Sequence, residues 1–209
     1  MKKPTKKRDP EATKRSILEA AVKEFSTYGL GGARVDRIAE RADANKRMLY
    51  HYFGNKDALF LAALEEAYTD IRNAERKLEL ENVDPVDSIR RLVTFTWDYY
   101  EENPHFLSLL NSENLHKAVH IKRSKHIQLL HSPFVEMLRR IIEKGQNQKV
   151  FRARVDPVQL YMSIASVCYF YFSNIHTLSV IFGRDLSAEE AREERRNHAV
   201  EVILGYLRV

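Results

Sequence analysis

The chain has 209 residues, of which 44% are apolar, and it contains only 7 Gly and 6 Pro. This length is enough for one or two domains with a packed core, and so few turn-forming residues argue against a turn-rich β protein. The single cysteine excludes an intramolecular disulfide and the basic N-terminus lacks the apolar segment of a signal peptide, so we expect a cytoplasmic protein.

Positive charge is concentrated in the first quarter of the chain. Residues 1–56 contain 14 Lys and Arg against 7 Asp and Glu, whereas residues 57–209 contain 20 against 22. A basic N-terminal part on a nearly neutral remainder is typical of a protein that binds a polyanion. The alternative is a basic segment that only aids solubility. The arm Met1–Arg8 could follow a phosphate backbone or could be a plain mobile terminus.

A first helix is expected to begin at Pro10, because Asp9 is a good N-cap and proline is favoured at the first helical position. Gly29 is well placed to end this helix in the left-handed conformation. Apolar residues recur on one face at helical spacing: Ile17, Ala21, Phe25 and Tyr28.

The stretch Val35–Phe53, VDRIAERADANKRMLYHYF, predicts two short helices joined by a tight turn, which is a helix-turn-helix that could bind duplex DNA. Asp43 suits a left-handed turn position, and Asn45 is a good N-cap for the second helix. That helix has about two turns and needs packing against its neighbours to be stable.

Eight residues in and around this motif are expected to contact DNA. The first residues of the second helix would face base edges, because Arg and Lys can hydrogen-bond guanine and Met can contact a thymine methyl group. Hydroxyl, imidazole and ammonium tips farther along suit phosphates. The predicted set is Arg34, Lys46, Arg47, Met48, Tyr50, His51, Tyr52 and Lys56.

The segment from Ile17 to Leu59 resembles the tetracycline-repressor (TetR) family of bacterial regulators. Two positions depart from the family pattern: Ala33 stands where a Thr is frequent, and Asp43 stands where a Gly is usual. We expect Arg34 to replace the Thr contact electrostatically and Asp43 to face its own backbone. The matching residues are Ala20-Ala21, Phe25, Gly29, Ile38-Ala39, Leu49-Tyr50, Phe53, Lys56 and Leu59.

A long helix is expected from Lys56 to Leu80, and its second half, Arg72–Glu81, is so highly charged that it should project into solvent. Further helices are expected to begin at Asp84-Pro85 and at Pro104, and Ser132-Pro133 is expected either to start or to kink the helix that follows. No segment predicts a strand. The pattern therefore predicts an all-α chain of about nine helices.

The segment from Asp156 to about Phe182 is apolar on nearly every face and is expected to be buried on nearly every face. Its longest apolar run, Leu160–Phe172, is shorter than the roughly 20 residues of a membrane span. A capping box at Ser187–Glu190 should start the last helix. That helix has a stripe formed by Ala191, His198, Ala199, Val202, Ile203 and Tyr206.

The resemblance implies a DNA-binding domain at residues 1–55 and a larger ligand-binding and dimerisation domain at residues 56–209. It also implies a homodimer formed by the last two helices, at about 156–182 and 187–207. Two DNA-binding domains would then occupy consecutive major grooves of a pseudo-palindromic operator in double-stranded DNA. The alternative is that both helices form the core of a monomer.

The resemblance further implies a small-molecule effector. Aromatic and Met side chains in the middle helices suit a flat, largely apolar ligand with a polar group, although aromatic residues at helical spacing are also ordinary core. The candidate pocket residues are Trp97, Tyr100, Phe106, Leu110, Phe134, Met137, Cys168, Tyr169, Phe172 and His176.

No metal or cofactor is expected. His116 and His120 lie four residues apart, but no Cys or carboxylate cluster completes a tetrahedral site, so a polar surface helix explains them better. Cys168 lies in an apolar segment and is interpreted as a buried small side chain.

The sequence thus predicts a ligand-responsive, sequence-specific DNA-binding transcriptional regulator, with a repressor favoured over an activator. A nonspecific DNA-binding protein would carry basic charge along the whole chain, whereas residues 57–209 are slightly acidic. An all-helical enzyme would need a nucleophile–base pair, a metal site or a phosphate-binding loop, and the sequence contains none that we can identify.

Overall fold

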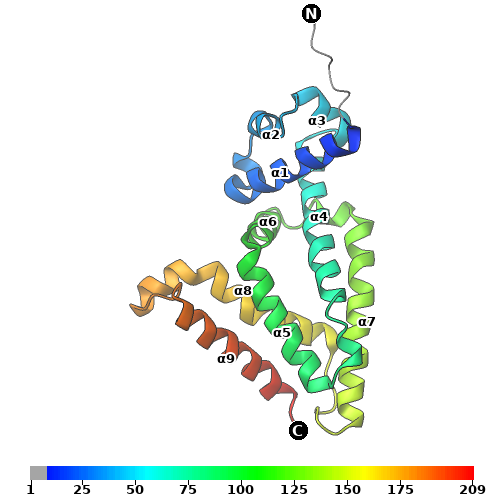
Figure 1. Cartoon of the computed structure of the whole chain (residues 1–209), viewed down its shortest axis with the longest axis vertical. Helices are drawn as coiled ribbons and strands as arrows, with labels where there is room; N and C mark the ends of the chain where they lie inside the picture. Colours follow the sequence, from blue (N-terminus) through cyan, green and yellow to red (C-terminus); the bar gives the residue numbers. More distant parts are fainter. Residues whose placement is uncertain (1–8) are drawn as a thin grey trace, which may run out of the picture. The chain divides into compact units, whose positions relative to one another are not determined.

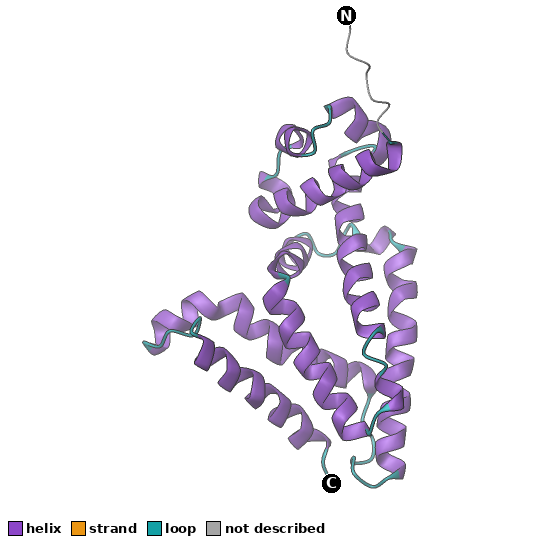
Figure 2. Cartoon of the chain, in the orientation of Figure 1, coloured by secondary structure: helices purple, strands orange, loops and turns teal. Residues whose placement is uncertain are grey.

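The computed structural model describes residues 9–209, and this part of the chain consists of helices and loops without a strand (Figures 1 and 2). The all-α prediction is confirmed, and the basic arm Met1–Arg8 lies outside the described residues. The nine α-helices of residues 9–209 are α1 (Pro10–Gly32), α2 (Val35–Arg41), α3 (Lys46–Phe53), α4 (Lys56–Arg76), α5 (Pro85–Glu102), α6 (Pro104–Leu115), α7 (Lys125–Asn147), α8 (Pro157–Phe182) and α9 (Glu189–Leu207).

The chain divides into two compact units. The head unit extends to Tyr68 and includes Ser108–Ile127, and the body unit comprises Thr69–Leu107 and Gln128–Val209. Three helices, α4, α6 and α7, therefore contribute residues to both units. The domain boundary at residues 55 and 56 stays a prediction.

The start of the head unit follows its sequence signals closely. The carboxylate of Asp9 accepts a hydrogen bond from the Glu11 N–H at 3.0 Å and caps α1. Gly29 has the expected positive φ of 64°, but its ψ of 174° only kinks the helix, which resumes for one turn to Gly32. Phe25 and Phe60 are fully buried, with ring centroids 5.1 Å apart in an edge-to-face arrangement that stabilises the core of the unit.

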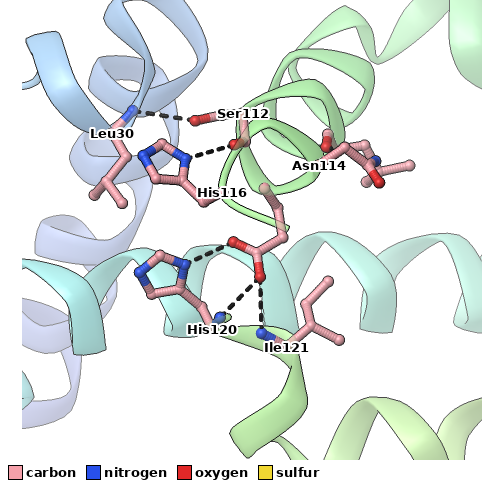
Figure 3. Close-up of polar contacts among 8 residues, drawn as sticks. Leu30, Ser112, Asn114, His116, His120 and Ile121 are labelled. Atoms are coloured by element: carbon pink, nitrogen blue, oxygen red, sulfur yellow. Dashed lines mark hydrogen bonds and ion pairs between the residues drawn. The ribbon is translucent and has the colours of Figure 1, made fainter. Parts of the chain in front are cut away.

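The end of α6 and the turn after it complete the head unit (Figure 3). The Ser112 hydroxyl accepts from the Leu30 N–H at 3.1 Å. The buried Glu113 carboxylate accepts from the backbone N–H groups of His120 and Ile121, both at 2.9 Å, and lies 2.7 Å from His120 Nδ1. The surface position expected for His120 is therefore wrong, because a carboxylate seven residues earlier holds the ring inside, whereas His116 is exposed.

Replacing Glu113 by alanine is expected to destabilise the protein by about 3 kcal/mol, because His120 and two backbone N–H groups lose their acceptor. Urea unfolding followed by circular dichroism measures this loss. The matched control is Asn114→Ala, next on the same helix but exposed, which should change the free energy of unfolding by less than about 0.5 kcal/mol. Equal effects of the two substitutions would contradict the structural role of Glu113.

The core of the body unit is formed by α5 packed against α8 and α9 (Figure 1). Asp84 and Asp156 cap α5 and α8 as expected, since each carboxylate accepts a backbone N–H within its first turn at 2.9 and 2.8 Å. Buried side chains line the side of α5 that faces its neighbours: Ile89, Leu92, Val93, Thr96, Trp97 and Tyr100.

Two expectations for the last helices are wrong. In the single chain α8 is not buried on nearly every face, because Phe170, Val180, Ile181 and Phe182 are exposed. By length and composition alone α8 could cross a membrane, a test that core helices of soluble proteins also pass. The capping box is absent, because the Ser187 hydroxyl and N–H both donate to the nearer Asp185 carboxylate, and α9 begins after Ala188 without a side-chain cap.

Candidate nucleic-acid interface and ligand cavity

The short helix α3 is held in place at its start and along one side. The Asn45 side chain accepts from the Met48 N–H at 3.0 Å, as expected for an N-cap. Asp43 has a φ of 48°, so the predicted left-handed turn position is confirmed. Leu49 is fully buried and anchors the helix to the head unit. These features fix the direction of the polar side chains on the rest of the helix.

The outer face of α3 carries the residues that were expected to contact DNA. Arg47, Tyr50 and His51 are exposed, whereas Met48, Tyr52 and the nearby Lys56 are half-buried. Arg34 is exposed at the start of α2. Lys46 forms an ion pair with Asp36 of α2. The Lys46 ammonium group would have to leave this ion pair in order to contact DNA. The roles of all eight residues in DNA binding stay predictions.

A buried carboxylate that the sequence did not single out orients this motif. Glu24 accepts hydrogen bonds from the Arg37 Nε at 2.7 Å and from the Arg34 N–H at 3.0 Å, which ties α1 to the start of α2. Burial raises the pKa of Glu24, but the hydrogen bonds from Arg37 and the backbone outweigh it, so the pKa lies below its usual value. The signal in the sequence was an acid inside an otherwise apolar face, beside Ala20-Ala21 and Phe25.

The body unit contains a cavity of about 350 Å³ between the end of α4, the short 3-10 turn Leu80–Asn82 and α7. Of the ten candidate pocket residues, only Phe134 and Met137 line this cavity. Trp97 packs against Tyr171 and Phe172 with ring centroids 5.0 and 4.6 Å away.

The other candidate pocket residues are distributed through the fold rather than around this cavity. Tyr100, Phe106 and Cys168 are buried, Tyr169 and Phe172 are half-buried, His176 is exposed, and Leu110 belongs to the head unit. The ligand-binding roles of the ten residues stay predictions.

The end of α4 is only partly exposed, so the expectation that all of Arg72–Glu81 projects into solvent is wrong: Arg76 is exposed, but two residues before it on the helix are buried. Arg72 and Glu75 are only 2% and 3% exposed, and α4 ends at Arg76. The Arg72 guanidinium lies 4.2 Å from the centre of the Phe134 ring, and its Nη2 donates to the Tyr161 hydroxyl at 3.2 Å. Charge alone misled the prediction, because the partners that cover Arg72 come from α7 and α8.

Arg72 and Glu75 form a buried ion pair that is not hydrogen bonded. The Arg72 Nη1 lies 2.9 Å from the Glu75 Oε2, but the two groups are not aligned, and neither atom has a hydrogen-bond partner among residues 9–209. Burial raises the pKa of Glu75 to about 7, although the charge of Arg72 lowers it. Glu75 is therefore poised between its neutral and charged forms at neutral pH.

This raised pKa predicts a pH dependence of stability. The folded state holds the Glu75 proton more tightly than the unfolded state does. Protonated Glu75 therefore stabilises the fold, and this stabilisation is fully present below about pH 4.5 and is lost as the pH rises through about 7. The wild type should lose about 2–3 kcal/mol of unfolding free energy relative to Glu75→Gln between about pH 5 and pH 8. Urea unfolding of both proteins across this range measures the difference, and parallel pH profiles would contradict it.

Two further sites lack the chemistry of a reactive centre. Cys168 is buried, as expected, and burial raises the pKa of its thiol to about 12, so the thiolate is not available at neutral pH. Within the described part of the chain, no group of three or more His, Cys, Asp or Glu side chains is arranged to hold a metal ion.

Comparison with known proteins gives matches over both units. A model described as bacterial regulatory proteins, tetR family, matches residues 17–63, and one described as tetracyclin repressor-like, C-terminal domain, matches residues 85–203. The chain is 41% identical to the HTH-type transcriptional repressor NicS of Pseudomonas putida over 198 residues, which are 95% of this chain and 93% of that protein.

Two further similarities come from Streptomyces coelicolor. The HTH-type transcriptional repressor SCO4008 is 44% identical over 108 residues, about half of each chain (52% and 53%). The crystal structure of the transcriptional regulator SCO4942 has the same fold, with a TM-score of 0.70 at 24% identity over 93% of this chain and 98% of that one.

Proposed function

The chain belongs to the tetracycline-repressor (TetR) family of bacterial regulators, and from this premise we propose that it is a cytoplasmic, homodimeric repressor that a small-molecule effector releases from its operator. The observation that carries the proposal is the geometry of α3. A capped helix, anchored by the buried Leu49, presents Arg47, Tyr50 and His51 to solvent on one short element. Such a helix fits the major groove of duplex DNA.

The side-chain chemistry of the motif supports different DNA contacts for different residues. Arg47 is an exposed cation at the start of α3, where a recognition helix reaches base edges. Tyr50 follows on the next turn of α3 and Lys56 begins α4. Both suit contacts with phosphates, which fix orientation but do not read sequence. Base reading and backbone contact would thus come from different residues of a rigid scaffold.

The uncovered apolar surface of α8 and α9 supports a dimer. Side chains of both helices border a shallow, largely apolar groove, and Val202 on it is 42% exposed in the single chain. A second copy related by two-fold symmetry would cover this surface with the same two helices. The groove residues are Met162, Ser163, Ser166, Val167, Val202, Ile203 and Tyr206.

The helix α4 supports a route from ligand to DNA. It begins with Lys56 in the head unit and carries Arg72 and Glu75, which line the cavity, in the body unit. A ligand bound at its end would bias the direction of one continuous helix. The effect on operator affinity can be no larger than the difference between the ligand's affinities for the two states of the protein.

Sequencing the genomic fragments that the purified protein retains tests the proposal. We expect the fragments to share a pseudo-palindrome whose half-sites are centred about 34–36 Å apart, one helical turn of DNA. If a retained fragment is a promoter, and transcription from it rises when the gene for this protein is deleted, the protein is a repressor. Fragments without any common sequence would contradict specific binding, and a fall in transcription would indicate an activator.

A further inference from the structure

We propose that the cavity between α4 and α7 binds the carboxylate of a small aromatic acid, with Arg72 as the anion-binding group. This inference rests on the proposed function, because it names the chemical class of the effector. It identifies the polar group of the flat, largely apolar ligand that the sequence favoured as a carboxylate.

Arg72 has donors that the described chain does not use. Its side chain is buried and carries five N–H groups, but only its Nη2 donates a hydrogen bond, to the Tyr161 hydroxyl. The Nε has no hydrogen-bond partner among the described residues, and the Nη1 has only the ion pair with the Glu75 carboxylate at 2.9 Å. Buried donors without an acceptor are rare in native proteins, so an acceptor is expected to enter the cavity that Arg72 lines.

The walls of the cavity suit a flat ring attached to that acceptor. Phe134 stacks beneath the Arg72 guanidinium at 4.2 Å and meets the Tyr161 ring edge-to-face at 5.2 Å. Leu130 and Met137 add apolar surface on the same helix. A volume of about 350 Å³ has room for one or two fused rings.

The charges around Arg72 favour an anion over a cation. An arginine side chain is a cation in proteins, whereas burial raises the pKa of Glu75 to about 7, so Glu75 is partly protonated near neutral pH. A neutral Glu75 can donate a hydrogen bond to a ligand oxygen. The ligand carboxylate and Glu75 would then share one proton while both lie beside the Arg72 guanidinium. The other charged residues that line the cavity are exposed. They are Arg140 and Glu81, which form an ion pair, and Arg76 and Glu79.

The test compares acids with neutral amides of the same shape. Benzoate, benzamide, 2-naphthoate and 2-naphthamide are titrated into the full chain by isothermal calorimetry near pH 7. At least one acid should bind at least tenfold more tightly than its amide, and Arg72→Gln should remove that preference. The matched control is Arg76→Gln, an exposed arginine of the same helix and cavity, which should keep it.

A second variant covers the case in which Arg72→Gln does not fold. Met137→Trp adds volume to the half-buried wall of the cavity and should weaken all binding at least tenfold. Circular dichroism verifies that each variant is folded. Equal binding of acids and amides, no binding of either acid, acid binding to Met137→Trp as tight as to the wild type, or an acid preference that survives in folded Arg72→Gln would overturn the proposal.

A DNA readout separates this inference from the proposed function. Fluorescence anisotropy of a retained DNA fragment is recorded with and without the acid that binds. Release of DNA by the acid but not by its amide supports both proposals. An acid that binds at Arg72 without releasing DNA supports the site and overturns its role as an effector site, and a chain that retains no DNA overturns the proposed function alone.

Discussion

Replacing Arg47 by alanine is expected to remove most of the preference of the protein for its operator over unrelated DNA. Arg47 is exposed at the start of α3, on a helix fixed by the Asn45 cap and the buried Leu49. A guanidinium that hydrogen-bonds a guanine contributes about 1–3 kcal/mol of discrimination, so specific affinity should fall roughly 5- to 150-fold. Lys46→Ala should have a smaller effect, because Lys46 must first leave Asp36.

The residues that we propose to contact phosphates should behave differently. Tyr50→Phe and Lys56→Ala are expected to weaken binding to operator and unrelated DNA alike, and Lys56→Ala should lower the salt dependence by about one charge. Titrations of both DNAs at several salt concentrations distinguish the two classes. Arg91→Ala, an exposed arginine in α5 of the body unit, is the control and should change neither. If Arg47→Ala weakened binding to both DNAs equally, its role in reading bases would be wrong.

Replacing Val202 by glutamate is expected to dissociate the proposed dimer and, with it, the tight operator complex. The substitution places an unpaired charge on the apolar groove of α8 and α9, and burying such a charge costs about 2–5 kcal/mol. The dissociation constant of the dimer should therefore rise by roughly 30-fold or more. Sedimentation equilibrium measures the mass of the chain directly.

The control for this prediction is Val119→Glu. Val119 and Val202 are both 42% exposed, but Val119 belongs to the head unit, so the same substitution there should leave the mass of the dimer unchanged. A wild-type chain that is monomeric at micromolar concentration, or a Val202→Glu variant that dimerises as tightly as the wild type, would contradict an interface at α8 and α9.

The head unit could be predicted from sequence because its signals are local. The caps at Asp9 and Asn45 and the left-handed turn at Asp43 each depend on residues within three positions along the chain. The same kind of signal failed at Ser187, where Asp185, two residues earlier, offered the serine a nearer acceptor than the helix did. Local rules thus succeed where a single partner is available.

The buried polar groups could not be predicted because their partners are distant. Arg72 is covered by Phe134 and Tyr161, more than sixty residues away in sequence, so its charge alone indicated an exposed position. Glu113 and His120 form their contact around a turn whose path, through left-handed residues at Lys117 and Ala118, no periodicity reveals. These tertiary contacts define the cavity and the end of the head unit.

The central claim is that two copies of the chain place two α3 helices in successive major grooves of one operator. Hydroxyl-radical footprinting on a retained fragment tests this claim most directly. We expect two protected half-sites, centred about 34–36 Å apart, that both disappear for the Val202→Glu variant at the same concentration. A single protected half-site, or protection that the variant leaves unchanged, would contradict it.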